Sequence, residues 1–509
     1  MSERIKDNKR IVSNTLFLYI RMFLIMAVTL YASRVVLDKL GVDDYGIYHS
    51  VSGVVAMLAF LNNTLSTGTS RFLTFELGKG NKDTLSETFN TAFYAHLLLA
   101  IIVVILFETV GIWFIQNKLI IPASRLIAAK WVFHISVITT FVSITQVPYT
   151  SVIIAHENMK VYAYVGIFDA IARLAIVFLL SISPFDRLIF YAFLVACVQL
   201  LVLVMYRMYC VKKYHESILR KVFNKNIFNN IISFSGLSLV ANISQIVSNQ
   251  GLVILINMFF QPSIVAAQAV GNQLSTAVTS FVSNLRTAIN PQIIKLYATG
   301  QYEESKKLTL TSSIYVHELV LFFALPLIVI MEPLLHYWLV DVPDYAVIFA
   351  QCIMIKQIFD VYNASLYTPM IASGELKTNS IASVLFSIGL FVVLYILLKM
   401  GFSVMWVQYL SIIQVFVFSY LVKPWILCKE LNYTWTEIFH CFLKCFIVSA
   451  LPVAVSVIMM LYFNVDNFIS MLLVASIICF SVLISSYIFL DKDTKRRIHR
   501  VIIRVLKRK

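Results

Sequence analysis

The stretch FNTAFYAHLLLAIIVVILFETVGIWFI, residues 89–115, decides the fold class. As a helix it is long enough to cross a hydrocarbon core about 30 Å thick, and similar apolar runs recur along the whole chain. Hydrophobic residues make up 60% of the 509 residues and charged residues only 13%, which is too little charge to cover a soluble protein of this length. The sequence therefore predicts an all-α integral membrane protein with no separate soluble domain.

The apolar runs predict about fourteen transmembrane helices. Their approximate limits are 11–31, 46–68, 89–115, 128–155, 161–182, 187–209, 230–257, 264–289, 311–333, 345–371, 379–398, 403–427, 440–463 and 467–490. The first run is too long for the core of a cleaved signal peptide, so we expect it to be retained. An even number of spans places both termini on one side, where Lys and Arg concentrate, and the positive-inside rule identifies this side as the cytoplasm. The loop with Lys118, Arg125 and Lys130 departs from the rule.

The charge and the motifs exclude several classes of function. The formal net charge of +15 reports orientation, with attraction to anionic lipid as a second effect, so we expect no nucleic-acid partner. No HExxH, GxSxG or Walker motif and no His/Cys ligand cluster occurs, and we expect no enzyme activity, cofactor or metal. The pair Asp43-Asp44 resembles an acidic pair in membrane glycosyltransferases, but a solvated turn is the simpler interpretation.

Two internal matches indicate a repeat. The segment GNKDTLSETFNTAFYAH (80–96) resembles GQYEESKKLTLTSSIYVH (300–317), and YTSVIIAHENMK (149–160) resembles YTPMIASGELK (367–377). The offsets are nearly equal and enclose an even number of spans, so both copies face the same way, as in transporters with two parallel halves. We expect six-helix lobes at 1–215 and 216–430, two further membrane helices at 431–490, and a basic amphipathic tail at 491–509. The tail lies on the cytoplasmic leaflet or, alternatively, stays in solvent and helps to fix the topology.

Charged residues inside predicted spans are candidates for function, because a charge in the bilayer is costly. Arg21 has no acidic residue three or four positions away, so it needs a distant partner or a water-filled cavity with an anionic guest. We expect Arg21 to contact substrate. The spans 230–257 and 264–289 are rich in amides and hydroxyls, which suit either the wall of such a cavity or hydrogen bonding between helices.

Two charged pairs leave two interpretations open. Asp169 and Arg173, and likewise Lys356 and Asp360, lie four residues apart on one helix face. Each pair either neutralises itself and locks helix packing or takes part in transport. Glu318 lies in the span 311–333, next to a histidine that we expect to pack by hydrogen bonding.

The segment with Ser33-Arg34 and LGVDDYGIY (40–48) resembles the region after the first span of bacterial polysaccharide (O-antigen, Wzx-type) flippases. These flippases belong to the multidrug/oligosaccharidyl-lipid/polysaccharide (MOP) exporter superfamily. The stretch from Arg71-Phe72 to Gly80, the two Tyr-Thr segments of the repeat and the fourteen-span layout resemble that family too. The resemblance implies two pseudo-symmetric, MATE-like lobes around a cationic cavity, and two additional helices that form a groove for a lipid tail.

The resemblance also implies a function and a set of residues. The expected transporter flips an undecaprenyl-diphosphate-linked oligosaccharide, the repeat unit of O-antigen, capsule or exopolysaccharide in lipopolysaccharide-type polysaccharide biosynthesis, across the bacterial inner membrane. The alternatives are a cation-coupled multidrug exporter and a membrane glycosyltransferase or polymerase. The partners would be the lipid-linked substrate, membrane lipids and H⁺ or Na⁺. The resemblance implies that Arg21, Arg34, Arg71 and Arg286 contact the substrate, while Arg34 and Arg71 fit equally well as anchors at the membrane interface. From their charge within predicted spans we expect Lys356 to contact substrate as well, and Asp169, Asp360 and Glu318 to bind the coupling ion.

Overall fold

The computed structural model describes residues 23, 25–57, 60–156, 158–182, 184–231, 247–465, 467–489 and 495. Every regular element in this described part is helical, and nine helices within it are long and apolar enough to cross a membrane. The predicted all-α membrane fold is thereby confirmed. Arg21 and all of the predicted basic tail except Lys495 lie outside the described residues.

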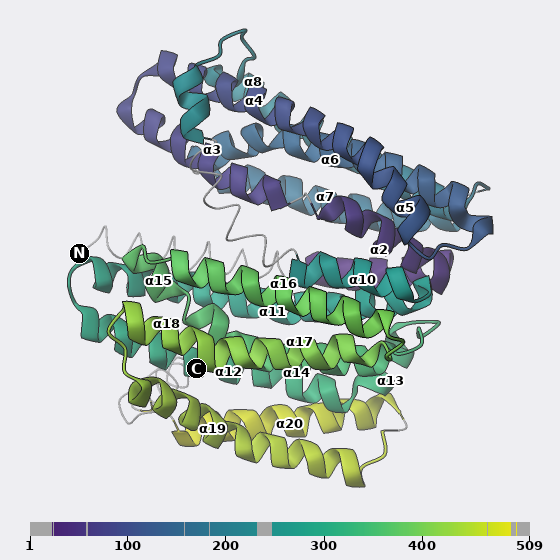
Figure 1. Cartoon of the computed structure of the whole chain (residues 1–509), viewed down its shortest axis with the longest axis vertical. Helices are drawn as coiled ribbons and strands as arrows, with labels where there is room; N and C mark the ends of the chain where they lie inside the picture. Colours follow the sequence, from purple (N-terminus) through teal and green to yellow (C-terminus); the bar gives the residue numbers. More distant parts are fainter. Residues whose placement is uncertain are drawn as a thin grey trace, which may run out of the picture. The chain divides into compact units, whose positions relative to one another are not determined.

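The chain forms two compact units (Figure 1). Unit 1 comprises Met1–Ala269, Leu339–Asp344 and Ser383–Val404, and unit 2 comprises Val270–Trp338, Tyr345–Ala382 and Met405–Lys509. Two long helices, α11 (Pro262–Ala298) and α16 (Lys377–Lys399), each run from one unit into the other. The lobe limits that the repeat suggests stay predictions.

The helices follow one another with short connections. Those of unit 1 are α2 (Val42–Ala56), α3 (Phe60–Lys79), α4 (Lys82–Leu106), η1 (Phe107–Gly111), α5 (Ile112–Lys118), η2 (Ala123–Arg125), α6 (Leu126–Ala155), α7 (Met159–Ser181), α8 (Arg187–Lys213), η3 (His215–Ser217), η4 (Val247–Gly251) and α10 (Leu252–Phe259). Those of unit 2 are α12 (Tyr302–Val329), α13 (Met331–Trp338), α14 (Ala346–Ser365), α15 (Thr368–Ser373), α17 (Met405–Val417), η5 (Phe418–Val422), α18 (Lys423–Glu430), α19 (Trp435–Tyr462) and α20 (Phe468–Phe489).

The first pair of matched segments shares a left-handed glycine. Gly80 (φ 74°) ends α3 and Gly300 (φ 77°) ends α11, both in the left-handed conformation that glycine adopts most easily. Asn81 then caps α4 by accepting hydrogen bonds from the N–H groups of Asp83 and Thr84. A third left-handed glycine, Gly374 (φ 84°), ends α15 in the second of the matched Tyr-Thr segments. The repeated glycines therefore mark the points at which the chain turns between successive helices.

Unit 1 is built around α6, which packs against α2, α3, α4 and α8 (Figure 1). Buried side chains of α4 and α6 form one apolar core, with Ala100 and Phe133 fully buried. Where α2 meets the start of α11, a Cβ at Gly46 would lie 1.9 Å from the carbonyl oxygen of Pro262. Only glycine fits this contact, which lies within the segment that resembles the flippase family.

Arg125 joins three helices of unit 1 at one end of the bundle. Its Nε donates a hydrogen bond to Oδ1 of Asp44 at 2.7 Å, its Nη2 pairs with the same carboxylate, and its Nη1 donates to Oδ2 of Asp186 at 2.6 Å. Asp186 also caps α8 by accepting from the backbone N–H groups of Leu188 and Ile189. The Asp44 side chain is 16% exposed and paired, so it does not form the solvated turn that the sequence suggested.

Arg125 belongs to the loop that departs from the positive-inside rule in the predicted topology. The Arg125 guanidinium faces two carboxylates, so the three side chains together carry a net negative charge. Burial alone would raise the pKa of Asp186, but the hydrogen bonds from Arg125 and from the backbone N–H groups hold that pKa below its usual range.

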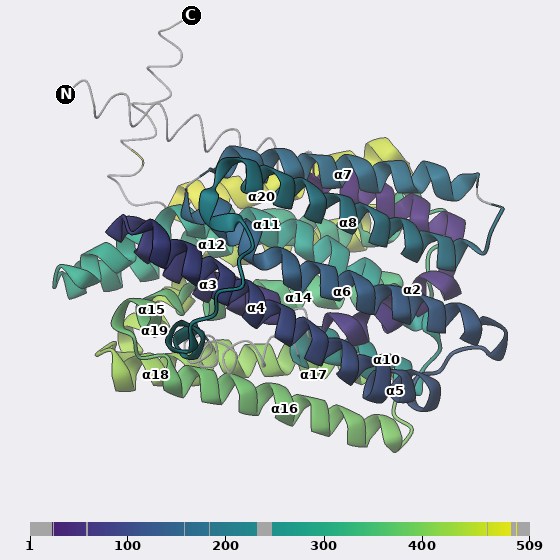
Figure 2. The same ribbon diagram turned by 90° about the horizontal axis from the view of Figure 1, so that it is seen from above.

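Unit 2 is built around α12, which packs against α14, α19 and α20. Figure 2 shows the helices from a second direction, at right angles to that of Figure 1. Nε2 of His317 on α12 lies 2.8 Å from Oγ of Ser449 on α19, and the imidazole stacks on the ring of Tyr362 from α14. The corresponding histidine of unit 1, His96, is fully buried, and its Nδ1 lies 2.7 Å from the carbonyl oxygen of Ala92. Both histidines therefore make hydrogen bonds in packed helix interfaces.

Candidate functional site: a basic cluster in unit 2

Four charged side chains come together in unit 2, and we call them the basic cluster: Arg286, Lys356, Asp360 and Lys423. Arg286 lies in the C-terminal half of α11, Lys356 and Asp360 on α14, and Lys423 at the start of α18. Each of the three basic side chains interacts electrostatically with Asp360. One carboxylate therefore faces three basic groups among helices that are predicted to span a membrane.

Lys423 is the most deeply buried member of the basic cluster, with 1% of its surface exposed. Its Nζ donates a hydrogen bond to Oδ1 of Asn379 at 2.7 Å and lies 4.9 Å from the ring centre of Tyr367 and 5.6 Å from that of Phe418. These neighbours are neutral. An amide oxygen and two aromatic faces stabilise an ammonium by hydrogen bonding and by cation–π attraction, but they do not cancel its charge.

A π-helical turn, η5, comes directly before Lys423. Such a turn inserts one extra residue into a helix and occurs frequently at functional sites. Because it shifts the helix face that follows, it affects the direction in which α18 presents its first side chain. A buried lysine and a π-helical turn therefore occur next to each other, and each is a feature found at functional sites of membrane helices.

Arg286 is held at the end of α14. Its Nη2 donates a hydrogen bond to the carbonyl oxygen of Ala364 at 2.5 Å. Ala364 lies in the last turn of α14, where carbonyl groups lack partners within the helix and carry partial negative charge. Nε of Arg286 is buried, and it has no hydrogen-bond partner among the residues that the structure describes. Arg286 therefore has one N–H group fixed to a carbonyl and a buried Nε–H that has no partner in the described part of the chain.

Lys356 and Asp360 do not neutralise each other by direct contact. Within the described residues they form no ion pair at 4 Å or less, although they lie four positions apart on α14. Oδ1 of Asp360 instead accepts a hydrogen bond from Asn363 at 3.1 Å. The other predicted pair behaves differently, because Nε of Arg173 lies 3.0 Å from Oδ2 of Asp169 on α7.

A narrow crevice adjoins Arg286, and in this conformation it is too tight to admit a water molecule. It is lined by Arg286, Ile289, Asn290, Ser312, Val316 and Ser365. Oδ1 of Asn290 accepts a hydrogen bond from Thr368 at 3.0 Å. The Ser365 side chain is 6% exposed, and its hydroxyl has no partner in the described part of the chain. Donors are thus present around a space that would have to widen before a ligand could enter.

The remaining predicted residues lie apart from the basic cluster. Arg34 is half-buried in the helix before α2, and Arg71 is exposed on α3, with its guanidinium 5.8 Å from the ring centre of Phe72. Asp169 is paired on α7, as described above. Glu318 on α12 interacts with Ser486 of α20, at the contact between α12 and α20. Of the predicted residues, the structure therefore brings together Arg286, Lys356 and Asp360.

Lys423 is the residue of the basic cluster that was not predicted from the sequence. It lies within the predicted span 403–427, so its depth alone was a usable signal. The residue is near the end of that span, where a lysine usually extends to the membrane surface. In the structure the Lys423 side chain is buried instead, and it donates a hydrogen bond to Asn379 of α16.

Neither a family model nor a curated protein matches the sequence. Several solved structures match the fold. An inward-facing multidrug resistance MATE family transporter of the MOP superfamily has a TM-score of 0.65 at 11% identity, covering 79% of this chain and 94% of that one. The lipid II flippase MurJ in an inward closed conformation has a TM-score of 0.67 at 14% identity, covering 93% of this chain and 98% of that one. A MATE protein in the straight conformation has a TM-score of 0.57 at 13% identity, covering 82% of this chain and 95% of that one. At these identities the likeness concerns the fold, and the chain has the fold of membrane transporters of the MOP superfamily.

Proposed function

We propose that this protein is a transporter that flips an undecaprenyl-diphosphate-linked oligosaccharide from the cytoplasmic to the outer face of a bacterial inner membrane. The observation that carries the proposal is the excess of positive charge in the basic cluster. Three basic side chains share one carboxylate inside unit 2, and the groups to which Arg286 and Lys423 donate hydrogen bonds are neutral.

Such an excess is costly in a membrane protein, because charges removed from water need compensation. An anionic substrate supplies that compensation when it binds. A diphosphate suits the site because phosphate oxygens accept several hydrogen bonds, and a guanidinium donates two of them in parallel. Arg286 has an unused Nε for this purpose, and Lys423 keeps further N–H donors on its ammonium.

The predicted topology places the basic cluster toward the cytoplasmic side. Residues 286 and 423 lie near the cytoplasmic ends of their predicted spans, and residue 360 lies in the cytoplasmic half of its span. A lipid-linked precursor made in the cytoplasm would meet these residues first. The closed crevice beside Arg286 would widen to receive the diphosphate, and this change in width is what alternating access requires. Arg21, Arg34 and Arg71 stay predicted substrate contacts, and H⁺ or Na⁺ stays the predicted coupling ion.

A cation-coupled multidrug exporter is the second candidate, and one feature favours it. Asp360 and Glu318 are carboxylates without a direct ion pair among the described residues, so either could bind a proton, Na⁺ or a cationic drug. The two candidates differ in the sign of the charge that they bind. A flippase needs the basic side chains for its anionic substrate, whereas an exporter of cations would gain from their removal.

The test is a flipping assay in proteoliposomes. A fluorescent prenyl-diphosphate-linked disaccharide is the probe, and dithionite added outside reports the fraction in the outer leaflet over time. We expect Arg286→Gln to slow flipping roughly tenfold, because a guanidinium–phosphate contact is a strong, charge-assisted hydrogen bond. Arg220→Gln, in the exposed loop after α8, is the matched control and should leave the rate unchanged.

Binding gives a second measure that separates the candidates. The wild type should bind a prenyl diphosphate more tightly than the corresponding prenyl alcohol, and Arg286→Gln should remove the difference. Equal binding of the two probes, with export of a cationic dye that persists in Arg286→Gln, would favour the exporter. A change in glycan length on the probe would indicate a glycosyltransferase or polymerase.

A further inference from the structure

A second polar site lies on the surface of unit 1, away from the basic cluster. Nδ1 of His134 on α6 lies 3.0 Å from Oε1 and 2.9 Å from Oε2 of Glu108. Glu108 belongs to η1, a π-helical turn that interrupts the helix running from Lys82 to Lys118. The side chains of Glu108 and His134 are 38% and 41% exposed, so this carboxylate–imidazole pair is accessible from outside the helix bundle.

Neighbouring tryptophans indicate the depth of the pair in the membrane. Trp113 on α5 and Trp131 on α6 are 53% and 55% exposed, and the ammonium of Lys118 lies 5.8 Å from the ring centre of Trp113. Exposed tryptophans of membrane proteins gather at the level of the lipid headgroups. Glu108 is five residues before Trp113 and His134 three after Trp131, so the pair lies roughly 5–8 Å deeper at 1.5 Å per helical residue. This is the level just below the headgroups.

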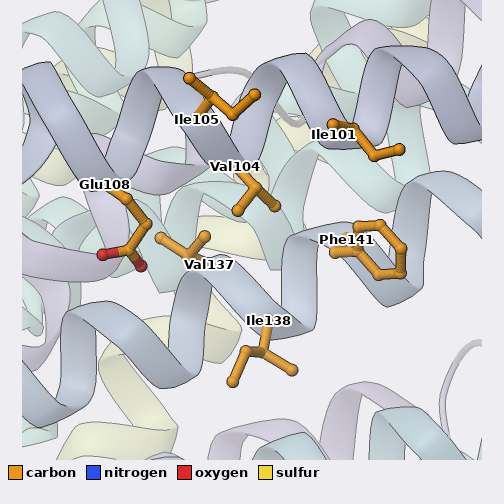
Figure 3. A pocket seen from close by; sticks show the side chains of 7 residues that line it. All are labelled: Ile101, Val104, Ile105, Glu108, Val137, Ile138 and Phe141. Carbon is orange, nitrogen blue, oxygen red and sulfur yellow. The ribbon is translucent and has the colours of Figure 1, made fainter.

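An apolar groove extends from Glu108 along α4 and α6 (Figure 3). It offers a volume of about 280 Å³ and is lined by Glu108 together with Ile101, Val104, Ile105, Val137, Ile138 and Phe141. Ile105 and Ile138 are 57% and 55% exposed, and both helices are apolar enough to cross a membrane. The surface thus combines a polar pair near the headgroups with a groove that continues toward the membrane interior.

We propose that this surface binds a phospholipid whose headgroup carries a primary ammonium, as in phosphatidylethanolamine. The ammonium would donate hydrogen bonds to the Glu108 carboxylate, and one acyl chain would lie in the groove. Charge selects this headgroup, because a carboxylate attracts an ammonium and repels the phosphate of an anionic lipid. A phosphatidylglycerol headgroup has no ammonium and gains none of this attraction. The proposal is independent of the transported substrate.

The experiment measures lipid retention by native mass spectrometry. The purified full-length protein is equilibrated with equal amounts of phosphatidylethanolamine and phosphatidylglycerol, and bound lipids are counted at increasing collision energy. We expect the wild type to retain phosphatidylethanolamine about tenfold more than phosphatidylglycerol. Glu108→Gln should abolish the preference. Ile138→Trp should fill the groove and lower retention of both lipids severalfold.

Matched controls separate the site from general lipid contacts. Ile171→Trp changes a side chain of α7 that is also 55% exposed, and Glu332→Gln removes an exposed carboxylate from α13. Both should keep the wild-type preference. Equal retention of the two lipids by the wild type would overturn the proposal. So would variants of Glu108 and Ile138 that behave like their controls.

Discussion

Arg125 in unit 1 and Lys423 in unit 2 show two ways of holding a basic side chain within a helical membrane protein. Arg125 is bound by two carboxylates, Asp44 and Asp186, which tie together the starts of three helices. Lys423 is more deeply buried, yet its direct partners are an amide and two aromatic rings. The paired charge stabilises structure at its own location. Lys423 shares Asp360 with two other basic groups and has no carboxylate in direct contact among the described residues, so an anionic ligand would stabilise its charge further. We therefore expect mutations of the two residues to have opposite effects.

The largest effect is expected at Arg125. Replacing it by glutamine leaves two carboxylates close together without their cation, and we expect the free energy of unfolding to fall by about 2 kcal/mol. Arg125→Lys keeps the charge but loses the bidentate hydrogen bonding, so its free energy of unfolding should lie between those of the wild type and Arg125→Gln. The measurement is unfolding in mixed micelles with increasing sodium dodecyl sulfate. Lys118→Gln, in the same region, is the control, and an equal loss there would remove the distinction.

Lys423 should show the reverse pattern. Lys423→Met replaces a buried ammonium by an apolar chain of similar length, so stability should stay the same or rise. Flipping of a prenyl-diphosphate-linked probe should slow about tenfold, because one phosphate partner is lost. The control is Lys429→Gln, an exposed lysine on the same helix. A variant that is destabilised and still flips at the wild-type rate would make Lys423 a structural residue.

The sequence predicted the helices and one ion pair between near neighbours, Asp169 and Arg173, but not the contacts between residues that are distant in the chain. Apolar length predicts a span directly, since it depends on consecutive residues, and the intramembrane positions of Lys356, Asp360 and Asp169 were predicted in this way. Pairing depends on how helices that are distant in sequence pack. Nothing near Arg125 in the chain points to Asp44 or Asp186, 81 and 61 residues away. The same reason hid the contact between Lys423 and Asn379, 44 residues apart.

Acid should weaken unit 1 through Asp186. Its pKa is lower in the folded protein than in the unfolded chain, so its ionised form contributes stability that is present above the unfolded pKa of about 3.9. That contribution is lost as the pH falls through the folded value. Because the side chain is 34% exposed, solvent screening should keep the contribution below about 1 kcal/mol. The difference in stability between wild type and Asp186→Asn, followed from pH 6 to pH 3, should shrink. A constant difference would contradict the pairing.

The smallest effect tests whether an ion pair within one helix is only structural. Asp169 and Arg173 are in contact, and a double-mutant cycle of Asp169→Asn and Arg173→Gln should give a coupling free energy of about 0.5 kcal/mol. The same variants also separate the two interpretations of Asp169. If the carboxylate only neutralises Arg173, the double variant flips the probe at the wild-type rate, since the pair is removed as a neutral unit. If Asp169 binds the coupling ion, flipping fails in the single and the double variant alike. A residue in a direct ion pair would then take part in transport, and direct pairing would not distinguish structural charges from those that act in transport.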